Sequence, residues 1–246
     1  MDAGGLMRVR ELWRFPVKSL QGERLTAADV GPAGIAGDRQ WALVDLGTGF
    51  GLTARRVPDL LFAAARLRAD GGVDVVLPDG AVTADDAVLS AWAGRPVALL
   101  PAAGTPQALR YESLDDDATD DGETGGWHDW TGAAGAFHDN PDFRVSLVST
   151  GTTGGWDRRR FRANVVLDGS GEEDLVGARV RLGSALLEIV DAIPRCVMVT
   201  RPQAGGIGRD TAVLKRIHRE RGGVLAVGAR VAEPGRVAVG DELRVD

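Results

Sequence analysis

The sequence predicts a mainly β protein, with a β-barrel-rich α+β fold that contains few short helices. Along its 246 residues, many short runs of strand-forming residues are separated by turns rich in Gly, Asp and Pro. Only two stretches combine helical periodicity with residues typical of helix ends. Strands and helices do not alternate regularly, so barrels are favoured over a parallel sheet built from βαβ units.

The first hundred residues contain three strand-like stretches. The first, residues 7–17 (MRVRELWRFPV), is limited by Pro16 to a strand end or an edge. The second is RQWALVDL at 39–46. The third, at 62–80, is divided by Asp70–Gly72, a sequence that favours a hairpin turn.

A helix and an acidic segment follow these strands. In residues 83–96, Thr83 or Asp85 can cap a helix and Gly94 can end it. The acidic, turn-rich segment 112–126 is typical of a linker or loop. It divides the chain into two predicted domains, residues 1–111 and 127–246.

The second half is again a succession of strands with one helix. The helix is expected at 210–223, with Asp210 as its cap and Gly222 at its end. The strand-like segments are 143–150, 162–169, 178–190, 196–200, 228–235 and 236–245.

Composition limits the possible partners and surroundings. A formal net charge of −6 argues against nucleic acid as a partner, because binding to phosphates requires clustered positive charge. A single cysteine excludes an internal disulfide. Nothing near Met1 reads as a secretory signal, and no apolar run approaches the roughly 18 residues of a membrane helix. We therefore expect a cytoplasmic protein without membrane contact.

Several common chemistries have no support in the sequence. The three histidines, His128, His138 and His218, lack metal-ligand spacing, and one cysteine cannot build a structural zinc site. The glycine-rich segment 151–161 lacks the lysine of a phosphate-binding P-loop. The G-x-S-x-G motif of serine hydrolases is also missing.

Two features leave alternatives open. Cys196 is either a small buried apolar residue or a thiolate favoured by Arg195 beside it. Lys18 is one of only two lysines among 29 basic residues. Scattered polar residues, although each suits a solvated surface, together suit an anionic ligand; these are Lys18–Ser19, Asp38–Arg39, Thr53–Arg55 and Arg162–Asn164.

The order of six segments resembles the MOSC family, named for the C-terminal domain of molybdenum cofactor sulfurase. The chain is similar to two-part members such as the amidoxime-reducing component of mitochondria and its bacterial relatives. The resemblance implies a MOSC-associated β-barrel domain at 1–111 packed on a MOSC domain at 127–246. The segments are FPVKSLQG, GIAGDRQWALVD, LTARRVPDL, FRANVVLDG, PRCVMVTRPQAG and PGRVAVGDEL.

The resemblance also implies a site for a molybdenum–molybdopterin cofactor. Cys196 matches the thiolate that ligates molybdenum, and Asp139 lies where relatives carry polar residues that face the metal, as a candidate proton donor. The matches to residues that hold the cofactor phosphate are Lys18, Ser19 and Arg39. The matches to residues that line or support the pterin are Thr53, Arg55, Arg162 and Asn164.

The implied function is an enzyme, a molybdenum-dependent oxidoreductase that reduces N-hydroxylated or N-oxide small molecules. Since the chain lacks the cysteines of an iron–sulfur cluster, its electrons must come from a separate protein, cytochrome b5-like, a ferredoxin or a flavin reductase. One alternative is a sulfur carrier, with a persulfide on Cys196 received from a cysteine desulfurase. The pyridoxal phosphate of longer relatives belongs to a domain missing here. A third alternative is a cofactor-binding protein without turnover.

Overall fold

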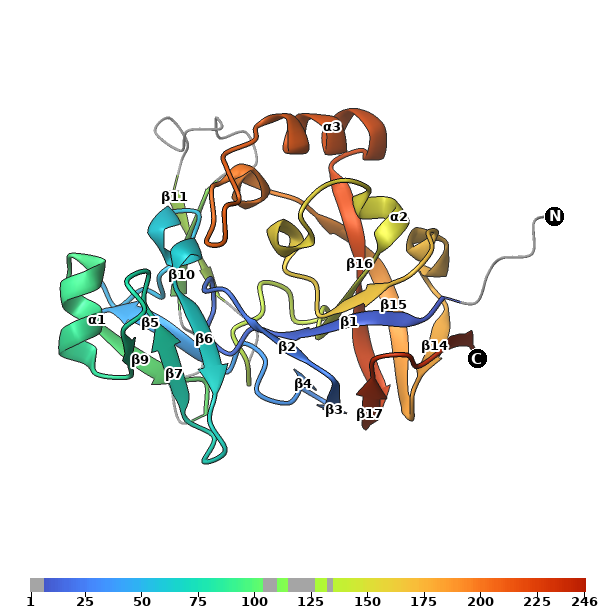
Figure 1. Cartoon of the computed structure of the whole chain (residues 1–246), viewed down its shortest axis with the longest axis horizontal. Coiled ribbons are helices and arrows are strands. Elements are labelled where there is room, and N and C mark those ends of the chain that lie inside the picture. Colours follow the sequence, from blue (N-terminus) through green and yellow to red (C-terminus); the bar gives the residue numbers. More distant parts are fainter. Residues whose placement is uncertain (1–6, 104–109, 115–126, 132–134) are drawn as a thin grey trace.

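The computed structural model describes residues 7–103, 110–114, 127–131 and 135–246. It confirms the predicted β-rich fold: strands dominate, and the described residues contain three α-helices and four short 3-10 helices. In Figure 1, the strands and helix of residues 41–101 lie on the left, and the long strands of residues 179–233 lie on the right.

The largest sheet has eight strands and curls around one apolar core. In spatial order it consists of β18 (Leu243–Val245), β14 (Arg179–Leu182), β15 (Ala185–Pro194), β16 (Val224–Glu233), β12 (Val145–Ser149), β13 (Val165–Leu167), β1 (Val9–Arg14) and β2 (Glu23–Leu25).

Four smaller sheets complete the β structure of the described residues. Their strands are β17 (Gly235–Ala238), β3 (Ala27–Gly31) and β4 (Gly34–Ile35); β5 (Trp41–Asp45) and β9 (Val97–Pro101); β6 (Ala64–Leu67), β7 (Val73–Val76) and β8 (Val82–Thr83); and β10 (Arg110–Leu114) and β11 (Trp127–Thr131). The β6–β7 pair is the predicted hairpin, since Asp70 accepts a hydrogen bond from the Gly72 amide in its turn.

The α-helices pack against strands of these sheets. They are α1 (Asp86–Ala93), α2 (Thr150–Thr153) and α3 (Ala212–Arg221), with 3-10 helices η1 (Pro58–Phe62), η2 (Arg158–Phe161), η3 (Glu172–Leu175) and η4 (Val197–Thr200). Asp85 caps α1 by accepting from the amides of Ala87 and Val88. The predicted cap of α3 is displaced: Thr211 is the cap residue, and Asp210 accepts instead from the Ala212 amide. None of the helices among the described residues has the length and apolar character to cross a membrane.

One predicted strand is wrong. Residues 196–200 form no strand; Val197–Thr200 are the 3-10 helix η4. Pro194 ends β15, and the Thr200 hydroxyl then bonds to the Val197 carbonyl at 2.8 Å, a local contact that favours a turn. Val199 is buried in an apolar cluster with residues of α3, so the apolar run serves helix packing.

The N-terminal strands are built into the sheet of the second half. β1 pairs with β13 and β3 pairs with β17, so strands from both ends of the chain share hydrogen bonds. Val9 and Leu12 lie in the same core as Val227 and Leu243. A second core belongs almost wholly to the first hundred residues. Of the predicted linker at 112–126, residues 115–126 lie outside the described residues, and Glu112–Leu114 belong to β10. The division into two domains therefore stays a prediction, and the large sheet crosses it.

Candidate functional site

A cavity of about 300 Å³ brings together all nine site residues predicted from the sequence. They come from the loop after β1, the loops on either side of β5, the segment before β12, the segment between η2 and β13, and the end of β15. The nine are Lys18, Ser19, Arg39, Thr53, Arg55, Asp139, Arg162, Asn164 and Cys196.

Backbone strain marks three of these positions. Among the described residues, only four other than glycine have a positive φ angle, and Ser19 (69°), Arg39 (51°) and Arg162 (52°) are three of them. L-residues adopt this region rarely, because the Cβ atom approaches the backbone, and such residues cluster at functional sites. The fold therefore holds these three side chains in directions that an ordinary loop would not give them.

Lys18 forms an ion pair with Asp139 inside the cavity. The Lys18 ammonium lies 2.5 Å from the Asp139 carboxylate and 3.2 Å from the Phe137 carbonyl. Burial lowers the pKa of Lys18, Asp139 opposes this shift, and the charges of Arg39 and Arg55 add to it.

Asp139 is ionised by the same cluster. Its side chain is 71% exposed, whereas that of Lys18 is only 8% exposed. The cavity walls partly desolvate the carboxyl, but Lys18 and then Arg55 and Arg39 hold its pKa well below the usual range. In this arrangement Asp139 is the counter-ion of Lys18, and a role for it in proton donation stays a prediction.

Arg39 and Arg162 are held together by a buried network. Arg39 contacts the Asp38 carboxylate, which also accepts from the Phe15 amide at 2.7 Å, and it donates to the Arg162 carbonyl at 3.1 Å. Both guanidinium groups lie over the Phe15 ring, at 5.1 and 4.4 Å from its centre. Burial first, and Arg39 second, lower the pKa of Arg162, and a guanidinium remains protonated at neutral pH even so.

The Asn164 side chain connects Arg39 to the neighbouring strands by hydrogen bonds. Its amide oxygen accepts from the Ser146 amide and hydroxyl at 3.1 and 3.0 Å, and from Arg39 at 3.5 Å. Its amide nitrogen donates to the Trp13 carbonyl at 3.3 Å. The side chain is thus engaged within the protein, and its contact with a ligand stays a prediction.

Ser19 connects the Lys18 loop to the segment that carries Thr53 and Arg55. Its hydroxyl accepts from the Ala54 amide at 3.0 Å. The neighbouring Thr53 hydroxyl is buried and has no hydrogen-bond partner among the described residues. Buried hydroxyl groups are almost always paired, so a missing partner at a cavity wall is consistent with a group supplied by a ligand.

The family follows from two models that together match most of the chain. The MOSC N-terminal beta barrel domain matches residues 6–124, and the MOSC domain matches residues 137–244. The chain belongs to the MOSC family. MOSC proteins are associated with molybdenum cofactor binding and sulfurase-like chemistry.

Solved structures show weaker likeness to this MOSC chain. The YuaD protein from Bacillus subtilis is 12% identical, with 97% of this chain and 94% of that chain covered and a TM-score of 0.45. YiiM from Geobacillus stearothermophilus is 14% identical, with 57% and 73% covered and a TM-score of 0.36. Among curated proteins, none matches this chain.

Among the described residues, eleven more line the MOSC cavity without having been predicted as part of the site, and three of these have titratable side chains: His138, Arg160 and Arg195. Burial, and then the charge of Arg39, lower the pKa of His138 to about 4, so its imidazole is neutral at pH 7. The only sequence signal for His138 was its position beside Asp139. Arg195 was noted for its charge next to Cys196, and nothing in the sequence distinguished Arg160 from the other arginines.

Cys196 is half-buried at the cavity wall, between β15 and η4. The preceding Arg195 side chain turns into the protein, where it donates to the carbonyls of Leu225 at 2.7 Å and Phe161 at 3.1 Å. Its second terminal nitrogen is buried and has no hydrogen-bond partner in the part of the chain that the structure describes. Burial is the main cause that lowers the pKa of Arg195, and Cys196 opposes the shift.

The donor set of the MOSC cavity fits a molybdopterin-type group. The described lining residues contain one lysine and five arginines but only one carboxylate, Asp139, which favours an anionic ligand. The single thiol, Cys196, is the kind of soft ligand that molybdenum accepts beside a dithiolene. Buried atoms of Thr53 and Arg195, which have no partner in the described ranges, add hydrogen-bonding capacity to the cavity wall.

Proposed function

We propose that the chain binds a molybdenum–molybdopterin cofactor in this cavity and is a molybdenum-dependent oxidoreductase that acts on N-hydroxylated or N-oxide small molecules. The observation that carries the cofactor assignment is the convergence of nine predicted residues on one cavity, three of them in strained backbone conformations. The reaction itself rests on the resemblance to the amidoxime-reducing component.

In this proposal, the residues of the chain divide the work of binding. Lys18, Ser19 and Arg39 hold the terminal phosphate, because they combine fixed positive charge with a hydroxyl group. Thr53, Arg55 and Arg162 contact the pterin, while Asn164 holds Arg39 in place. Cys196 supplies the thiolate ligand of the metal.

The bound metal would supply the redox chemistry, with electrons delivered by a separate electron-transfer protein. Reduction of an N–O bond consumes two electrons and two protons and releases water. Asp139 is ionised when paired with Lys18, so it can carry a proton to the substrate only after that pair separates. Lys18 released from Asp139 is then available to a phosphate.

The deciding experiment measures molybdenum and released pterin per chain, after production in a host that makes the cofactor. We expect near-stoichiometric metal in the wild type. Lys18→Met should lose cofactor, whereas Lys215→Met, which alters the only other lysine on an exposed helix face, should retain it. Cys196→Ser should bind pterin but show an altered molybdenum spectrum.

Activity is then tested with an aryl amidoxime and a chemical electron donor. Turnover by the loaded wild type and its loss in Cys196→Ser would support the reductase. If the cofactor-containing protein does not turn over N–O substrates, the reductase function is rejected and only cofactor binding is supported. Metal-free protein with labile sulfur on Cys196 would replace it with the sulfur-carrier function.

A further inference from the structure

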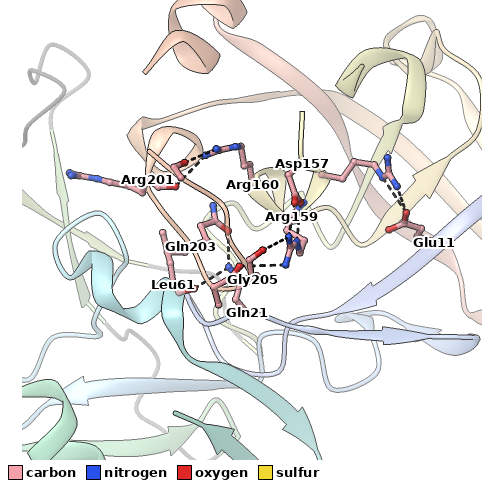
Figure 2. Close-up of polar contacts among 12 residues, drawn as sticks. Glu11, Gln21, Leu61, Asp157, Arg159, Arg160, Arg201, Gln203 and Gly205 are labelled. Carbon is pink, nitrogen blue, oxygen red and sulfur yellow. Dashed lines mark hydrogen bonds and ion pairs between the residues drawn. The ribbon is translucent and has the colours of Figure 1, made fainter. Parts of the chain in front are cut away.

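Arg160, which lines the cavity, contacts the backbone segment that follows Cys196. It comes from η2, and its residue surface is only 8% exposed. One terminal nitrogen donates to the carbonyls of Val199 at 3.1 Å and Arg201 at 3.3 Å, and the other donates to Gly208 at 2.7 Å. Figure 2 shows the contact between Arg160 and Arg201 beside the Gln21–Gln203 pair.

The carbonyls that Arg160 contacts are ones the backbone leaves unpaired. η4 is a single turn, and the last carbonyls of any helix lack partners within it. A planar guanidinium can donate to several carbonyls at once, and such charge-assisted hydrogen bonds are stronger than neutral ones. Arg160 therefore closes the end of η4 and ties it to the loop at Gly208.

Cys196 is the residue that directly precedes η4 and accepts its first hydrogen bond. The Val199 amide donates to the Cys196 carbonyl at 3.2 Å, which forms the first turn of η4. On the other side, the Arg195 amide donates to the Gly223 carbonyl at 2.9 Å. Cys196 is thus held between two anchored segments, and only the one that follows it depends on Arg160.

Besides backbone hydrogen bonds, which include one from the Asp210 amide to the Thr200 carbonyl of η4 at 2.9 Å, side chains of two other residues hold the same loop without contacting η4. Gln21 donates to the Gln203 side chain at 2.7 Å, within the buried part of the protein. Arg159 donates to the carbonyls of Ala204 at 3.4 Å and Gly205 at 3.3 Å, and its side chain is 35% exposed. Arg159 is therefore a matched neighbour that differs from Arg160 in what it contacts.

We infer that Arg160 is a positioning residue for Cys196: its fork on the Val199, Arg201 and Gly208 carbonyls fixes η4, so that the thiol is held at the cavity wall. That this thiol is a metal ligand rests on the proposed function. The positioning itself can be measured without cofactor, because Cys196 is the only cysteine in the chain and every thiol signal comes from it.

The test compares how fast cofactor-free protein reacts with a bulky maleimide (pyrenyl) and a small one (ethyl). The rate with the bulky reagent divided by the rate with the small one reports steric access to the thiol. Both reagents react with the same thiolate, so the ionised fraction of Cys196 cancels in this ratio. In Arg160→Met we expect the ratio to rise by about tenfold, because the loss of charged hydrogen bonds allows local opening of η4. Hydrogen exchange should accelerate in residues 197–208 and stay unchanged in β12 and β13.

The controls separate positioning from charge and from general destabilisation. Arg159→Met should keep the ratio within about twofold of the wild type, because it leaves the η4 carbonyls paired. Arg160→Lys keeps the charge but not the fork, so its ratio should stay raised; this variant also serves if Arg160→Met does not fold. A wild-type ratio in either Arg160 variant, or an equal rise in Arg159→Met, would overturn the inference. Neither result depends on whether molybdenum binds.

Discussion

At the residue scale, the cavity contains more positive than negative side chains, since one lysine and five arginines face a single carboxylate among the described lining residues. Lys18 is buried, and its ion pair with Asp139 joins residues 121 positions apart in the chain. The positive charges of Arg39 and Arg55 disfavour the protonated form of Lys18, whereas the negative charge of Asp139 favours it. The Asp139 carboxylate thus occupies the position beside Lys18 that an anionic ligand would take. Under the proposed function, the cofactor phosphate would replace this carboxylate as the partner of Lys18.

His138 makes the stability of the protein depend on pH. Its pKa is about 4 when folded and 6.5 in the reference state, so the unfolded chain binds the proton first as the pH falls. The stability contributed by the neutral, buried imidazole is present above pH 6.5 and is lost between pH 6.5 and about 4. From pH 7 to pH 4.5, the wild type should lose roughly 2 kcal/mol more unfolding free energy than His138→Gln.

Urea unfolding at the two pH values measures this difference. His218→Gln is the control, because His218 is exposed on α3 and should follow the wild type. Equal losses in the wild type and in His138→Gln would show that the imidazole is not held neutral.

At the scale of elements, the short strand β4 contains a glycine, Gly34, at which any side chain would cause both backbone strain and steric overlap. Gly34 in β4 has a φ angle of 101°, and an added Cβ would lie 2.2 Å from the Arg144 carbonyl oxygen. Gly49 also has a positive φ angle, 75°, but an added Cβ there would meet no atom within 4 Å. An alanine at Gly49 would therefore cause backbone strain alone, whereas an alanine at Gly34 would cause backbone strain and steric overlap.

Gly34→Ala should lower the free energy of unfolding by about 3 kcal/mol or prevent folding, because strain and overlap add. Gly49→Ala should cost only about 1 kcal/mol, from strain alone. Chemical denaturation of both variants measures the difference. Similar costs at the two positions would mean that β4 moves away from Arg144 freely.

At the scale of the whole molecule, the two halves of the sequence are not independent in space. β1 lies beside β13, and Leu12, which is fully buried, pairs with Val165. A fragment of residues 127–246 would lose this strand and expose the edge and core that it covers. The MOSC half of the chain therefore depends on the N-terminal strands.

We expect the fragment 127–246 expressed alone to aggregate or remain unfolded. Co-expression with residues 1–114 should restore a soluble complex, because that piece supplies β1, β2 and β3. Size-exclusion chromatography and the dispersion of the amide NMR spectrum distinguish the two cases. A fragment that is monomeric and cooperatively folded by itself would contradict this dependence.

The sequence by itself determined the β-rich class, the hairpin at Asp70–Gly72, a helix capped by Thr83 or Asp85, and nine of the residues that line the cavity, Lys18 and Cys196 among them. These features depend on local propensity, turn chemistry or segment order, which are readable along the chain. Only the tertiary structure decided that residues 196–200 form η4, that Lys18 pairs with Asp139 and that Arg160 closes η4. The contacts of Lys18 and Arg160 join residues far apart in sequence, and the packing of Val199 against α3 favours η4 over a strand; burial of this kind overrides local propensity.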